Sequence, residues 1–150
     1  MKATILSRRP ASKGQSLVEF AISLTFILIL LAGAVYFGIG LFYYIAMRDA
    51  AQEGALYGSM NPDDVSGIQN RAANAAGDGF VKTLYDAGDM SVSVAYTGAH
   101  CEGNGITVTL EHDYSLAWLP IGSFLQPFIG SDTIHLRATV TDTILTPPCE

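Results

Sequence analysis

The sequence is poor in basic residues and has long stretches without charge. Of its 150 residues, 8 are Lys or Arg, and half of these precede Gln15. The rest of the chain is therefore strongly acidic and should repel nucleic acid. Charged side chains are absent from residues 20–47, a run of 28 residues. Because a helix needs about 20 apolar residues to cross a bilayer, this run predicts a membrane-spanning helix.

Motifs for catalysis and metal binding are also absent from the sequence. It contains no HExxH, paired CxxC, phosphate-binding loop or nucleophile elbow. The three histidines, His100, His112 and His135, lie in different segments, whereas a catalytic metal usually needs three protein ligands. We therefore expect neither an enzyme nor a bound cofactor or metal.

The basic residues at the N-terminus predict the orientation of the membrane helix. Basic flanks of such helices stay in the cytoplasm, so the N-terminus should lie inside and the acidic C-terminal part outside the inner membrane. Cleavage as a secretory signal after Ala34 would leave a long exposed apolar tail, which argues against that signal. Two readings remain: an uncleaved single-pass anchor, or a leader removed on the cytoplasmic side before the apolar run.

The residues at this junction favour the second reading. The segment Lys13–Phe20 resembles the processing site of type IV prepilins, particularly in the tight-adherence (Tad, or Flp) branch. There a Gly is followed at a fixed distance by Glu and an aromatic residue, as Gly14 is followed here by Glu19 and Phe20. Together with residues 48–55, which follow the apolar run, the junction is similar to the TadE-like minor pilins.

The resemblance covers residues 13 to about 58 and implies a structural role. Phe20 stands where the major Flp pilins commonly have Tyr, and the exported part is far longer than theirs, which favours a minor subunit. The resemblance implies that a prepilin peptidase cleaves between Gly14 and Gln15. It also implies assembly into a Tad/Flp adhesion pilus, or priming of one. The implied partners are other pilin subunits, an inner-membrane platform with its ATPase, and the lipid bilayer before assembly.

Two alternatives to this function stay open. A pseudopilin of a type II secretion system would be processed in the same way, whereas an uncleaved membrane-anchored binding domain would keep its N-terminal residues. The predicted organisation is a basic leader at 1–14, a transmembrane and assembly helix at 15–47, an exported continuation of the helix at 48–60 and an extracytoplasmic domain at 61–150.

Glu19 is the one acidic residue of the predicted transmembrane and assembly helix at 15–47. A carboxylate in a membrane helix costs about 3 kcal/mol near the bilayer centre, and less near its edge, so it tends to be paired or functional. Cleavage would give Gln15 a free amine, and a neighbouring subunit's amine could then pair with Glu19 and set the axial register. The alternative is a capping box, in which Ser16 caps the helix and Glu19 bonds the N–H at its start.

The outer part of the helix carries a stripe of small residues. Ala46, Ala50, Gly54 and Gly58 recur at four-residue spacing, which allows another backbone to approach closely. The stripe either seats the helix on the sheet of its own domain or packs it against a helix of another subunit.

The rest of the exported part predicts an α+β domain. Asn61 and Pro62 predict the start of a short helix that runs to about Gly77, and a weaker helix ends before Gly88. Alternating residues near 91–96, 106–111 and 134–140 predict strands, and residues 111–113 a solvated strand end. We expect the N-terminal helix to pack on a small antiparallel sheet of three or four strands, a pilin-like arrangement.

The two cysteines, Cys101 and Cys149, lie in the exported part, where an oxidising compartment permits a disulfide. Pairing Ile106 with Ile144 in an antiparallel sheet would bring both cysteines to one end of it. The bridge would then hold the C-terminus.

The connection at residues 115–131 is too apolar for a solvated loop, with Trp118, Phe124 and Phe128 among its residues. It is expected to cap the core, to form an interface with other subunits or with the surface to which a pilus adheres, or to lie on the membrane.

Overall fold

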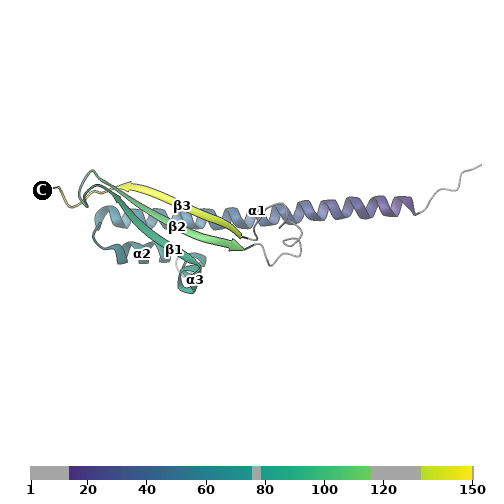
Figure 1. Ribbon diagram of the computed structural model, residues 1–150, viewed down its shortest axis with the longest axis horizontal. Helices are drawn as coiled ribbons and strands as arrows, with labels where there is room; N and C mark the ends of the chain where they lie inside the picture. Colours follow the sequence, from purple (N-terminus) through teal and green to yellow (C-terminus); the bar gives the residue numbers. More distant parts are fainter. Residues whose placement is uncertain (1–13, 76–78, 116–132, 150) are drawn as a thin grey trace, which may run out of the picture. The chain divides into compact units, whose positions relative to one another are not determined.

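The computed structural model describes residues 14–75, 79–115 and 133–149, and it is an α+β protein, as predicted (Figure 1). The chain divides into two units, Met1–Ile39 and Gly40–Glu150. Its elements in chain order are α1 (Gln15–Met60), α2 (Val65–Asn74), α3 (Phe80–Ala87), β1 (Met90–Thr97), β2 (Gly105–Ser115) and β3 (Thr133–Thr143).

Residues 15–39 of the first unit are helical and form the first part of α1. Most of their apolar side chains are exposed, and the Phe37 side chain is exposed to 73%. Among the described helices, α1 is the one long and apolar enough to cross a membrane. Helix formation satisfies every backbone group within the segment, which is what a bilayer requires.

The second unit contains an antiparallel sheet with the strand order β1-β2-β3. The predicted register was wrong by two residues on β3, because Ile106 lies opposite Asp142 rather than Ile144. Ile144 instead donates its N–H to the carbonyl of Asn104, at 2.8 Å. A shift of two residues keeps each side chain on the same face of the sheet, so the predicted inner face is unchanged.

The core lies between one face of the sheet and the helices. Along β2 the even-numbered residues from Ile106 to Tyr114 are buried, and the last turns of α1 and parts of α2 and α3 pack against this layer. The alternating pattern of the sequence therefore reflects a sheet that is covered on one face. The largest fully buried apolar side chains are those of Met47, Ile68, Val81, Ile106, Val108, Leu110 and Ile144.

The start of α2 differs from the prediction. Asp64, and not Asn61, is the N-cap residue, since its side chain accepts a hydrogen bond from the N–H of Gly67 at 2.9 Å. The carbonyl of Asn61 accepts the N–H of Asp64, and the carbonyl of Pro62 accepts the hydroxyl of Tyr96. Asn61 and Pro62 thus form a turn before the helix. The helix begins later than predicted because Asp64 supplies the capping side chain.

Candidate functional site

The junction at which the sequence predicts processing lies at the start of α1. The helix begins at Gln15, and its first hydrogen bond runs from the N–H of Val18 to the carbonyl of Gly14, at 3.2 Å. Ser16 therefore lies within the first turn and not at the N-cap, which is not the arrangement of a capping box. The side-chain amide of Gln15 instead donates to Oε1 of Glu19, at 3.3 Å.

The environment of Glu19 is an open, apolar helix surface. Within the described residues of the first unit, Glu19 is the only charged side chain, and Phe20 beside it is exposed to 65%. Gly14, Gly33 and Gly38 also have open space around them, since a Cβ added at any of them would meet no atom within 4 Å. This surface requires lipid or other apolar helices around it.

The stripe of small residues packs against other elements of the second unit. Ala50, Gly54 and Gly58 are buried, and Ala46 is partly buried against the core. A Cβ at Gly54 would lie 3.0 Å from the Cβ of Ala72 on α2, and one at Gly58 would collide with Ile106 on β2. The small residues thus let α1 approach both α2 and the sheet of its own protomer.

A cluster of aromatic residues around Tyr43 is not evident from the sequence. The Tyr43 ring lies 4.1 Å from the ring of Phe80, 5.5 Å from that of His112 and 5.0 Å from that of Tyr114. The prediction of a solvated strand end was wrong for His112, which is buried and bonded through Nδ1 to the carbonyl of Asp89, at 2.7 Å. Helix spacing and strand alternation would place these rings on inner faces, but cannot show that they meet.

The C-terminal segment is held by the disulfide between Cys101 and Cys149. In the same region the N–H of Gly103 donates to the carbonyl of Ile144, at 3.0 Å, and the N–H of Glu102 to that of Pro147, at 2.8 Å. The bridge and these hydrogen bonds fix the residues after β3 against the loop that joins β1 and β2.

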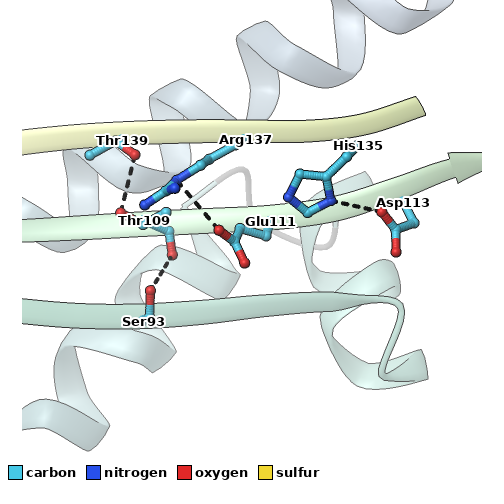
Figure 2. Close-up of polar contacts among 7 residues, drawn as sticks. All are labelled: Ser93, Thr109, Glu111, Asp113, His135, Arg137 and Thr139. Carbon is cyan, nitrogen blue, oxygen red and sulfur yellow. Dashed lines mark hydrogen bonds and ion pairs between the residues drawn. The ribbon is translucent and has the colours of Figure 1, made fainter.

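The outer face of the sheet is polar (Figure 2). Oγ1 of Thr109 lies 3.1 Å from that of Thr139, and Nε of Arg137 lies 3.4 Å from Oε1 of Glu111. Nδ1 of His135 lies 2.8 Å from Oδ1 of Asp113. Among the described residues, these side chains pair with one another across neighbouring strands of this face.

The search for metal ligands and the predicted interface residues give two further results. Residues 14–75, 79–115 and 133–149 contain no group of His, Cys, Asp or Glu that could hold a metal ion. The predicted interface residues Trp118, Phe124 and Phe128 lie outside the described residues.

The chain thus combines a helix long and apolar enough to cross a membrane with a small α+β domain, which is a pilin-like organisation. The family described as "TadE-like protein" matches residues 14–56. This match confirms the resemblance seen at the junction and includes Gly14, Glu19 and most of the stripe. It ends within α1, so the sheet lies beyond it. No curated protein and no solved structure matches the chain significantly.

Proposed function

We propose that this protein is a structural minor pilin subunit of a Tad/Flp adhesion pilus. Before assembly it is held in the inner membrane, with its N-terminus inside and its sheet domain outside. A prepilin peptidase then cleaves after Gly14, and an inner-membrane platform with its ATPase adds the subunit to other pilins or uses it to prime the filament. Its role is assembly and not catalysis.

The observation that carries this proposal is the TadE-like match over residues 14–56, which includes both the junction and the apolar helix. The open surface of residues 15–39 supports it, because a helix that leaves the bilayer must exchange lipid for other apolar helices. The small-residue stripe is already occupied in its own domain, so contacts between subunits fall to the exposed apolar part of the helix.

Glu19 gives the assembly its axial register in this proposal. Before cleavage its carboxylate accepts the Gln15 side-chain amide. After cleavage the Gln15 of a neighbouring subunit offers a cationic amine, and an ion pair between desolvated groups is far stronger than one in water. Only a processed neighbour provides that amine, so unprocessed copies are excluded from the filament.

Co-expression with and without a prepilin peptidase tests the processing step. N-terminal sequencing and intact mass should show a mature chain that begins at Gln15 only when the peptidase is present. Protein recovered from pilus fractions with residues 1–14 still attached would contradict the proposal. Fractionation of filaments away from secretion complexes separates a pilus subunit from a type II pseudopilin.

Substitution of Glu19 tests the register. Glu19→Gln should leave insertion and cleavage intact while removing the subunit from filaments, because a neutral amide forms no ion pair with a cationic amine. Glu53→Gln is the matched control, since Glu53 lies on the same helix and pairs with Arg71 of its own domain, at 3.5 Å. Normal incorporation of the Glu19→Gln subunit would contradict the register role.

A further inference from the structure

The sheet has two edges, and their backbone groups are bonded differently. β1 and β3 are the edge strands, since the strand order is β1-β2-β3. At the β1 edge the side-chain amide of Gln69 on α2 donates to the carbonyl of Val92, at 3.1 Å. Between His135 and Thr141, no described residue bonds to the backbone of β3 from its outer side. The β3 edge is therefore the more open of the two.

The hydrogen bond between Ile144 and Asn104 shows which backbone groups of β3 face outward. The N–H of Ile144 donates to the carbonyl of Asn104, at 2.8 Å, and this pair continues the register of β2 and β3. Because alternate residues of an antiparallel strand bond to the same neighbour, the even-numbered residues of β3 bond to β2. The odd-numbered residues from His135 to Thr141 therefore turn their N–H and C=O groups away from β2.

The carboxylate of Asp142 marks the end of this open edge. Its Oδ1 accepts the N–H of Thr143, at 2.8 Å, which is the next odd-numbered donor of the strand. Native edge strands are usually protected from pairing by Pro, Lys, a bulge or a short length. β3 has 11 residues, and residues 133–141 include no Pro or Lys. The edge over residues 135–141 is thus a template for main-chain hydrogen bonds with another strand.

The inner face of β3 is covered less completely than that of β2. Val108 and Leu110 on β2 are fully buried, whereas Val140, which lies opposite Val108, is only partly buried. Leu136 is also partly buried, and Ile134 is exposed to 42%. A strand added at this edge would cover these side chains with its own inner-facing side chains. Apolar residues are therefore favoured at alternate positions of that strand.

The outer face of β3 indicates the charge of such a strand. Arg137 lies in the middle of the open edge, and its side chain is exposed to 62%. Its ion pair with Glu111 joins Nε to Oε1 at 3.4 Å, whereas a guanidinium has five N–H donors (Figure 2). Arg137 can therefore accept a second carboxylate from the open side. Opposite charges across neighbouring strands stabilise a sheet, which favours Glu or Asp on the outer side of the added strand.

We infer that the open edge of β3, residues 135–141, is a docking site for an extended acidic segment of a partner protein. The segment adds to the sheet as a strand antiparallel to β3, with apolar side chains over Leu136 and Val140 and a carboxylate beside Arg137. A second copy of this chain fits less well, because pairing β3 with itself around Ala138 brings the two Arg137 side chains to diagonal positions on one face. The inference goes beyond the proposed function and depends on neither cleavage nor a pilus.

Hydrogen exchange in the full-length protein in micelles tests this docking site. In the protein alone, the amides of Arg137, Thr139 and Thr141 should exchange about tenfold faster than those of Leu136 and Val140, which bond to β2. A short synthetic peptide that alternates Val and Glu is then added. It should slow exchange at the three odd-numbered amides by about tenfold and leave the two even-numbered amides unchanged.

Changes to the peptide and to Arg137 provide the controls. The same peptide with Lys in place of Glu should bind about tenfold more weakly, although the exported part of the chain is acidic overall. N-methylation of the residues that face β3 should abolish the protection, because it removes the main-chain donors of the peptide. Arg137→Gln should remove the preference for Glu over Lys while leaving the edge open.

Four results would overturn the docking site. Slow exchange at the odd-numbered amides of the protein alone would show that the edge is already covered. If that slow exchange appeared only as the protein concentration rose, the occupant would be a second copy and not an acidic partner. Binding that survives N-methylation would not be strand addition. Preference for the Lys peptide would reflect only the net negative charge of the chain.

Discussion

The backbone N–H of Leu145 donates a hydrogen bond of 2.8 Å to the carbonyl of Ser59, and this bond joins the C-terminal segment to the last turn of α1. The hydroxyl of Thr146 adds a second bond, to the carbonyl of Met60, at 2.9 Å. The last carbonyls of a helix have no partner within it. Residues that lie 86 positions apart in the chain thus complete the C-terminal end of α1.

The disulfide should therefore stabilise the domain and this helix end together. Cys101→Ser combined with Cys149→Ser should lower the free energy of unfolding by about 3–4 kcal/mol, since the bridge closes a loop with a sequence separation of 48. Urea unfolding of the full chain in micelles, with and without reductant, measures this loss. Thr146→Val, which removes only the bond to Met60, should cost about 1 kcal/mol. Equal stability of the oxidised and reduced proteins would contradict this role.

Gly58 should be the least tolerant glycine of α1. A Cβ there collides with Ile106 and would lie 3.1 Å from Cδ1 of Ile68. Gly58→Ala should destabilise the domain by about 1–2 kcal/mol, because overpacking outweighs the gain in helix propensity. Gly33→Ala is the matched control, since its Cβ meets no atom within 4 Å, and it should not destabilise the protein. Thermal unfolding of both variants compares the two sites, and equal midpoints would contradict the tight approach.

Asp64 should make the domain sensitive to acid. The Gly67 N–H and then the Ser66 hydroxyl, both bonded to its carboxylate, hold the pKa of Asp64 below its ordinary value. The unfolded chain therefore binds the proton more readily, so this stability is complete above about pH 4 and is lost as the pH falls through the folded pKa.

Asp64→Asn tests this contribution. It should lower the unfolding midpoint at pH 7 and flatten its dependence on pH below about 4, because no carboxylate remains to titrate. Asp49→Asn is the control, since no ion pair holds Asp49 among the described residues. An unchanged acid limb in the Asp64→Asn variant would exclude Asp64 as its source.

The sequence predicts the fold well where local chemistry decides it. Strand alternation gives the inner face of β2, and the run without charge gives α1. The predicted register of β3 was wrong by two residues, because strand alternation does not distinguish registers that differ by two. Asn61 was a plausible cap on sequence grounds, and only the bonds of Asp64 show which residue starts α2.

The candidate site, like the fold, could be predicted only in part from the sequence. Gly14 and Glu19 are visible in the sequence because they form a local motif, and the TadE-like match covers them. The surroundings of Tyr43 are not visible, because Phe80, His112 and Tyr114 reach it from other elements. Contacts between distant segments depend on register and crossing geometry, which periodicity does not specify.

The ion pair between Glu111 and Arg137 should contribute little to stability. Both side chains remain substantially exposed, and their Nε–Oε1 distance of 3.4 Å is long for a charge-assisted bond (Figure 2). A double-mutant cycle with Glu111→Gln and Arg137→Gln should give a coupling energy below about 1 kcal/mol that falls with salt. A larger coupling energy would mean that this face is shielded from solvent.

Tyr43 should be the aromatic residue of α1 on which the stability of the domain depends most. Its ring touches α3 and β2, so Tyr43→Ala removes contacts with three aromatic rings at once. We expect a loss of about 2–4 kcal/mol in unfolding free energy, from the cavity and from the lost aromatic contacts. Tyr44→Ala is the matched control, because the neighbouring ring is exposed to 40%, and it should cost less than about 1 kcal/mol. Urea unfolding of the two variants in micelles compares them directly. If the two losses were equal, the cluster around Tyr43 would not be what fixes the sheet to α1.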